Sequence, residues 1–318
     1  MKTKIMLALI AACFAINAFA EGMTASLQSG DKLSVFYGTT AFKEAYAAAQ
    51  DGDVITLSLG KFTDLDEAIS KSIKVYGTYA FSESNSSMVN NLSVIAANVK
   101  LEGIYIYELD PSASLGLTLR SCNINSIVAT NQYSNILVEQ CQISDFTDVK
   151  FANNFSFRNT VFKSIQGNNL AATGYMEHCL VFENDEDFSA IYKNCILGYS
   201  PSSSGYVLFC SPSEFYHNVF FYKDYAPSTL NYNFNYGVAH SDNQSISMEI
   251  MNNYFKISFP NIPTNIPSGS DGTSVGPNGG IGFSKYPTIP RITRSEISNT
   301  ADDNGNIHVV IEATSQRQ

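Results

Sequence analysis

A ten-residue unit recurs seven times between residues 99 and 223 and constrains the fold more than any other feature of the chain. Each unit consists of a short strand, a polar bend and a second short strand. The units begin at Val99, Leu117, Ile136, Phe155, Gly174, Ala190 and Glu214, and residues 245–255 resemble an eighth, less regular unit. Positions one, three, six and eight are almost all apolar or small. This alternation predicts two strands that turn the same face toward a common core.

Position five of the unit predicts a tight bend. Its residues are Gly103, Ser121, Gln140, Asn159, His178, Asn194 and Asn218. Glycine and asparagine tolerate the left-handed backbone that a bend between two strands requires.

Position four alternates in charge through six successive units. It contains Glu102, Arg120, Glu139, Arg158, Glu177 and Lys193, followed by His217 in the seventh unit. If the units stack about 4.8 Å apart, each charge inside the series lies between two charges of opposite sign, which favours that register. The pattern predicts coils that stack in sequence order, as in a solenoid. It also favours a structural role for these charges over a catalytic one.

Position six contains most of the cysteines. Its residues are Ile104, Cys122, Cys141, Thr160, Cys179, Cys195 and Val219, and Cys210 lies outside the pattern. Cysteines on neighbouring coils have nearly parallel Cβ vectors, which do not give the preferred disulfide dihedral angle. We therefore expect buried free thiols, with disulfides between stacked cysteines as the alternative.

Residues 1–20 are typical of a secretory signal peptide. A basic start is followed by an apolar stretch and an A-x-A-like site at residues 18–20. The alternative is a lipoprotein anchored through Cys13. Without Lys2 and Lys4 the chain has 17 basic and 29 acidic residues, a net charge of −12. This charge argues against nucleic acid and anionic lipid as partners, and no other stretch is long and apolar enough to span a membrane. We expect export to the periplasm, the medium or the cell surface.

Residues 42–62 (FKEAYAAAQDGDVITLSLGKF) combine a short helix, a Gly-Asp turn and a strand. This order resembles the opening of secreted right-handed parallel β-helix proteins of the pectate-lyase-like superfamily. Residues 271–280 also resemble the glycine-rich closing segment of such proteins. The expected fold is an all-β, single-stranded right-handed parallel β-helix. It comprises an N-terminal helical cap and first coil (21–60), coils (61–259), a closing loop (260–290) and a C-terminal hairpin (291–318) that covers an end or edge of the solenoid.

Motifs for a known chemistry are missing from the sequence. It has no G-x-S-x-G, phosphate-binding glycine loop, H-E-x-x-H or C-x-x-C. The resemblance directs attention to polygalacturonases and calcium-dependent lyases, yet the paired aspartates, G-H-G and R-I-K of polygalacturonases are absent. We therefore expect no specific enzyme family.

Three groups of residues remain as candidates for function. Asp145, Lys163 and Glu183 lie at positions nine and ten, where two carboxylates two coils apart could act across a water molecule. Glu183, Asp185 and Asp187 could bind calcium; no other cofactor is expected. Tyr222, Tyr225, Tyr232 and Tyr236 could form a platform for sugar rings. Solubilising edge charges, an ordinary acidic turn and self-packing of a long loop are the respective structural alternatives.

These patterns support two hypotheses about function. The first is a secreted or surface protein without catalytic activity that binds polysaccharide. The second is a polysaccharide lyase or glycoside hydrolase that acts on an acidic glycan through Asp145, Lys163 and Glu183. A fold alone does not choose between them.

Overall fold

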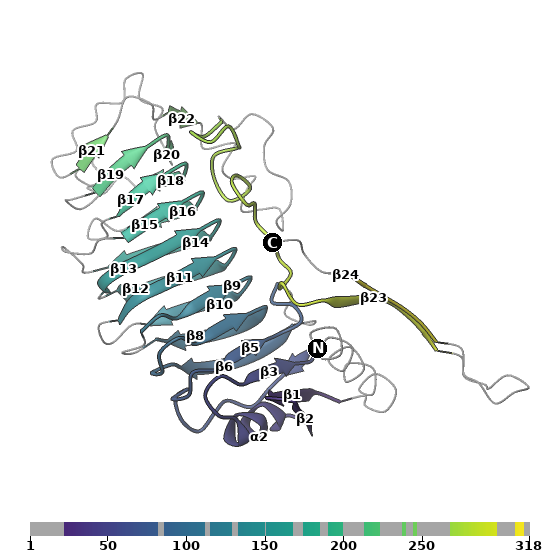
Figure 1. The fold of residues 1–318 in the computed structure, drawn as a ribbon. Coiled ribbons are helices and arrows are strands. Elements are labelled where there is room, and N and C mark those ends of the chain that lie inside the picture. Colours follow the sequence, from purple (N-terminus) through teal and green to yellow (C-terminus); the bar gives the residue numbers. More distant parts are fainter. Residues whose placement is uncertain are drawn as a thin grey trace, which may run out of the picture.

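A computed structural model of the chain describes residues 22–81, 86–111, 115–128, 133–149, 151–167, 174–184, 190–199, 213–222, 237–239, 244–246, 268–297 and 309–314. Within these residues two long sheets form a β-solenoid (Figure 1). Sheet A contains, in spatial order, β2 (Lys32–Tyr37), β1 (Thr24–Ser29), β3 (Val54–Leu57), β5 (Lys74–Tyr76), β7 (Lys100–Glu102), β9 (Thr118–Arg120), β11 (Tyr133–Glu139), β13 (Phe151–Arg158), β15 (Gly174–Glu177), β17 (Ile191–Lys193), β19 (Ser213–Tyr216) and β21 (Gly237–Ala239). Sheet B contains β4 (Gly60–Lys61), β6 (Ser87–Ser93), β8 (Ile104–Asp110), β10 (Asn123–Val128), β12 (Gln142–Val149), β14 (Val161–Gly167), β16 (Leu180–Asn184), β18 (Ile196–Tyr199), β20 (Val219–Tyr222) and β22 (Gln244–Ile246).

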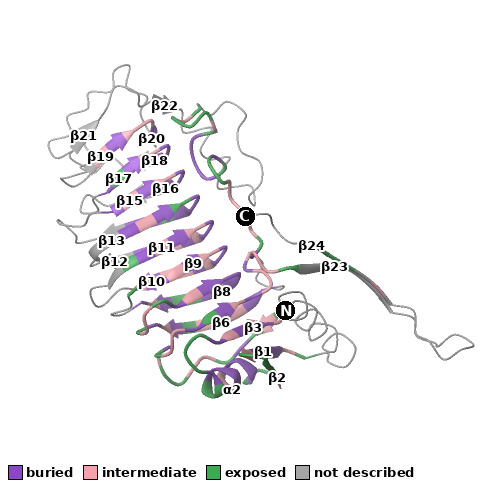
Figure 2. Ribbon diagram, viewed as in Figure 1, coloured by how far each residue is buried: buried purple, intermediate pink, exposed green. Residues whose placement is uncertain are grey.

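The predicted parallel β-solenoid is confirmed. From β3 to β21, each strand of sheet A pairs in parallel with the corresponding strand of the next coil, and sheet B repeats this arrangement. Position three is buried throughout the stack, and so is position eight in six successive coils. The position-three residues are Leu101, Leu119, Val138, Phe157, Met176, Tyr192 and Phe215, and those of position eight are Ile106, Ile124, Ile143, Phe162, Val181 and Leu197. The core therefore runs along the inside of the solenoid, between the two sheets (Figure 2).

A left-handed residue joins each sheet A strand to the following sheet B strand. The φ angles of Gly103, Ser121, Gln140, Asn159, His178 and Asn194 lie between +47° and +70°, as predicted for position five.

The predicted register of the seventh unit is wrong by one residue. Tyr192 pairs with Phe215 and Lys193 with Tyr216, and the positive φ falls on His217. Asn218 therefore occupies position six and is fully buried. The apolar Val219 suggested the other alignment.

The N-terminal end of the solenoid has an antiparallel cap. Strand β1 pairs antiparallel with both β2 and β3. Helix α2 (Ala41–Ala48) begins after Thr40 and buries Phe42, Ala45 and Tyr46 against these strands. The short helix predicted for this segment is confirmed.

The C-terminal hairpin consists of β23 (Arg291–Ile297) and β24 (Val309–Thr314). Among the described strands, these two pair only with each other, and the ribbon extends away from the stack (Figure 1). The expectation that this hairpin covers an end or edge of the solenoid is therefore wrong.

Candidate functional site

Residues 268–290, named here the closing strap, run back along the bends from the C-terminal coils toward the N-terminal ones (Figure 1). The strap meets the bends of six coils in reverse order. Ser270 N–H donates to Asn194 Oδ1 (2.9 Å), Asp271 Oδ2 lies 2.8 Å from His178 Nε2, and Asn159 Nδ2 donates to the Pro277 and Gly279 carbonyls (2.8 and 2.6 Å). Further along, Gln140 Nε2 donates to the Gly282 carbonyl, Ser121 Oγ donates to the Tyr286 carbonyl, and the Thr288 N–H donates to Glu102 Oε1.

The bend residues are polar because their side chains form hydrogen bonds with backbone groups of the strap. A left-handed residue aims its side chain out of the turn, and the strap brings backbone groups that need partners. Close approach demands small residues at two points. A Cβ on Gly279 would lie 1.8 Å from the Ser274 carbonyl oxygen and 2.3 Å from His178 Nδ1, and one on Gly276 would lie 2.4 Å from Ile196 Cδ1.

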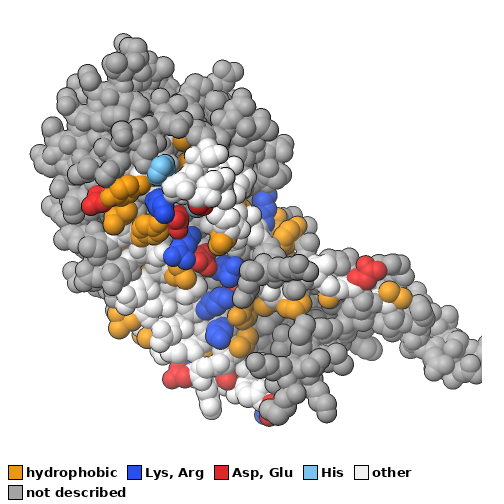
Figure 3. Space-filling view, turned by 45° about the horizontal axis from the view of Figure 1, so that its top comes forward, with side chains coloured by type: hydrophobic (Ala, Val, Ile, Leu, Met, Phe, Trp, Pro, Cys, Tyr) orange, Lys and Arg blue, Asp and Glu red, His pale blue; other side chains and the backbone are white. Residues whose placement is uncertain are grey.

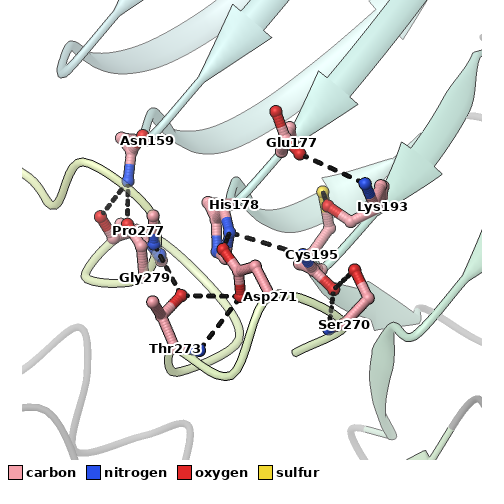
Figure 4. A network of polar contacts seen from close by, with 12 residues as sticks. Asn159, Glu177, His178, Lys193, Cys195, Ser270, Asp271, Thr273, Pro277 and Gly279 are labelled. Carbon is pink, nitrogen blue, oxygen red and sulfur yellow. Dashed lines mark hydrogen bonds and ion pairs between the residues drawn. The ribbon is translucent and has the colours of Figure 1, made fainter. Parts of the chain in front are cut away.

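His178 and Asp271 form the centre of the strap contact (Figure 4). The Thr273 N–H (3.0 Å) and hydroxyl (2.9 Å) both donate to Asp271 Oδ1. Burial acts to raise the pKa of Asp271, but the hydrogen bonds from Thr273 and His178 outweigh it and lower this pKa to about 2. An oriented His–Asp pair could serve as an acid–base pair. Here the imidazole is 2% exposed and covered by Gly279 and Gly280, so it holds the strap and does not face substrate.

The side chains at position six form a column of hydrogen bonds inside the solenoid. The Cys122 N–H donates to Cys141 Sγ (3.4 Å), Cys141 N–H to Thr160 Oγ1 (3.4 Å) and Cys195 N–H to Asn218 Oδ1 (2.8 Å). Cys122, Cys141, Cys179 and Cys195 are free thiols, as expected, and Cys210 lies outside the described residues. Burial raises the pKa of the Cys141 and Cys179 thiols, which are therefore protonated hydrogen-bonding groups and not nucleophiles.

The predicted carboxylate column is in register. Asp145 pairs with Ser164, which pairs with Glu183, so the two carboxylate positions lie two strands apart, about 9.5 Å between backbones. Asp145 is half-buried and Lys163 is exposed on β14. The Glu183 side chain lies outside the described part of the structure.

Most residues of the other candidate groups lie outside the described part of the structure. Asp185, Asp187, Tyr225, Tyr232 and Tyr236 lie outside the described residues, and only the backbone of Tyr222 is described, in β20. Among the residues that the structure does describe, no group of three or more His, Cys, Asp or Glu is placed to hold a metal ion.

Sheet B presents a polar outer face that the sequence reasoning missed. On β8, Ile104, Ile106 and Leu109 are buried, so the residues between them point outward, and β10 and β12 follow the same pattern. This tyrosine–amide face consists of Tyr105, Tyr107, Asn123, Asn125, Gln142 and Ser144 on β8, β10 and β12, with Tyr105, Asn123 and Gln142 aligned. Tyr107 is 53% exposed.

Position seven carried the signal for this face. It is polar in Tyr105, Asn123 and Gln142 but apolar in the four following coils, at Val161, Leu180, Ile196 and Val219. The apolar members are at most 4% exposed, and Gly276 of the strap lies against Ile196. Position seven therefore distinguishes covered coils from open ones.

Sheet A presents the alternating charges on its outer face (Figure 3). The predicted order is confirmed, because Glu102, Arg120, Glu139, Arg158, Glu177 and Lys193 pair successively between neighbouring strands. Arg158 Nη1 lies 3.9 Å from Glu139 Oε1, and Lys193 Nζ lies 3.7 Å from Glu177 Oε1.

No helix of the described residues has the length and hydrophobicity to cross a membrane. Comparisons of the chain with protein-family models, curated proteins and solved structures gave no match.

Proposed function

We propose that this protein is exported and that the tyrosine–amide face binds a polysaccharide without transforming it. The observation that carries the proposal is the combination of exposed tyrosine with aligned amides on one rigid sheet. Tyrosine rings stack on the apolar faces of sugars, while amide groups donate to and accept from sugar hydroxyls. The signal-like residues 1–20 support export.

The repeating geometry supports a polymer as the ligand. Equivalent residues of successive coils lie about 4.8 Å apart along the solenoid, so the face offers similar groups at regular intervals. A chain of sugars that lies along the solenoid axis would meet Tyr105, Asn123 and Gln142 in turn. The tyrosines named from the sequence, Tyr222, Tyr225, Tyr232 and Tyr236, are proposed as further sugar-binding residues of the same chemical kind.

The binding experiment uses affinity electrophoresis against a panel of neutral and acidic polysaccharides, followed by calorimetry on any that retard the protein. Tyr107→Ala is expected to weaken binding by about tenfold, because a stacked ring contributes about 1.4 kcal/mol. Tyr37→Ala is the matched control, since Tyr37 is 62% exposed on β2, away from this face. Equal loss in both variants, or no retardation on any polysaccharide, would contradict the proposal.

The register of Asp145 and Glu183 favours a second candidate function. A lyase or hydrolase that acts on an acidic glycan could use these carboxylates with Lys163 as base, with calcium as the cation that bridges to uronate groups. Degradation of a uronate polymer, measured with added calcium and with EDTA, tests this. Activity that survives in Asp145→Asn and Lys163→Ala would exclude these residues, and complete inactivity of the wild type would remove the hypothesis.

A further inference from the structure

The charged row on sheet A is separate from the tyrosine–amide face and plays no part in the proposed function. Three of its members are only partly covered: the side chains of Arg158, Lys193 and Glu177 are 47%, 38% and 27% exposed. Position two of each unit lies beside it on the same face. There Ile191 is 40% exposed, and Leu137 and Tyr175 are half-buried. Figure 3 shows hydrophobic side chains next to the charges along this face.

We propose that this face is a docking surface for a second copy of the chain, packed face to face about a two-fold axis parallel to the strands. Such an axis reverses the order of the coils and keeps position four of one copy opposite position four of the other. Because the charges alternate, an axis midway between two coils places every charge opposite one of the other sign. An axis through a coil would oppose like charges. The row is therefore complementary to itself in one class of registers and repulsive in the other.

Burial reduces the choice to two registers, with the axis on either side of the coil of Arg158. Glu102 is fully buried, ion-paired with Lys100 Nζ at 2.6 Å and bonded to the strap, so the accessible row starts at Arg120. With the axis between the coils of Arg158 and Glu177, Arg158 of one copy faces Glu177 of the other, and Glu139 faces Lys193.

The same axis matches the residues of position two. Leu137 of each copy then lies opposite Ile191 of the other, and Ser156 lies opposite Tyr175. Position two thus selects this axis, because the half-buried Leu137 meets the exposed Ile191 while the charges meet their opposites. One symmetry operation accounts for both columns.

A second copy fits the row better than a polymer of uniform charge does. An acidic or basic chain that lies along the row would meet a repelling residue at every second coil, whereas a reversed copy meets none. The face is narrow in the direction of the strands, because most of its strands contain three or four residues. An interface below the standard size of about 800 Å² per partner gives weak association, and exposed charges make that association sensitive to salt.

The test uses two charge reversals at the axis, Arg158→Glu and Glu177→Arg. Each variant alone places like charges opposite each other twice, so its self-association, measured by analytical ultracentrifugation, is expected to weaken by more than tenfold. A one-to-one mixture restores both opposite pairs and is expected to form the heterodimer. Lys61→Glu, an equal charge change at an exposed residue of β4, is the control and is expected to associate like the wild type.

Thermal unfolding checks that each variant is folded. If the reversals do not fold, Ile191→Glu keeps the row intact and places a charge opposite the partner's Leu137, so it is expected to weaken association. A wild type that stays monomeric up to about 1 mM, a mixture that stays monomeric, or an Ile191→Glu variant that associates normally would each overturn the proposal.

Discussion

The residue that follows each bend has a hydrogen-bonding task besides filling the core. Its backbone N–H lies where the chain has left sheet A and has not yet joined sheet B. The side chain at position six of the next coil accepts from this N–H, as Thr160 does for Cys141 and Asn218 does for Cys195. Each such side chain also donates to a carbonyl, for example Thr160 Oγ1 to Arg158 O at 2.8 Å. A small residue that both donates and accepts suits this position, and cysteine meets that need.

Thr160 gives a direct test of this role. Thr160→Val keeps the shape of the side chain but leaves the buried Cys141 N–H without its acceptor, so it is expected to lower the free energy of unfolding by about 1–3 kcal/mol. Thr160→Ser retains the hydroxyl and serves as the control. Urea denaturation followed by circular dichroism measures both. An equal loss of stability in the two variants would assign the effect to the methyl group and contradict the hydrogen-bonding role.

Residue patterns predicted most of the stack but not this task. Alternation and charge order are visible one unit at a time, because they reflect which face each residue occupies. The apolar Val219 suggested itself for position six, whereas hydrogen bonding between coils requires Asn218 there. The residue type alone could not show whether a cysteine only fills space in the core or also accepts a hydrogen bond.

Among the elements, the closing strap was the least predictable. Its glycine-rich composition marked a closing segment, but its path depends on side chains that bind its backbone, such as Asn159 to Pro277 and Gly279. Backbone carbonyls carry no sequence signature. The tyrosine–amide face was missed for a related reason. The sequence does not show which coils have a covered outer face, so the polar residues at position seven could not be recognised as an open surface.

The strap is expected to loosen in acid. The pKa of Asp271 falls from its ordinary 3.8 to about 2 in the folded chain, so its contribution to stability is complete above pH 4 and is lost as the pH falls toward 2. The melting temperature of the wild type, measured by thermal unfolding, should therefore fall more steeply between pH 4 and pH 2 than the melting temperature of Asp271→Asn. Parallel curves for the two proteins would show that Asp271 does not anchor the strap.

In the whole molecule, the strap changes how stability is distributed. A solenoid without long-range contacts is held together by neighbouring coils, and its ends can unfold separately. The strap links bends from Glu102 to Asn194 in one continuous segment. It therefore couples coils that do not touch one another.

Removal of the strap is expected to reduce this coupling. A chain that ends at residue 267 should unfold in urea over a broader range, with a smaller m-value, than the full-length protein. Asn159→Ala, which removes two strap hydrogen bonds, should lie between the two. A truncated chain with an unchanged m-value would show that the coils unfold as one unit without the strap.

The return path of the strap also sets an order of events during synthesis. Thr288 bonds to Glu102, 186 residues earlier in the chain, and Tyr286 bonds to Ser121, 165 residues earlier. Such distant pairings form slowly, because a long loop must close before they contribute. A chain that emerges from its N-terminus can stack its coils as they appear. Its row of bends stays open until almost the last residues arrive, so an incomplete chain is left with this edge uncovered.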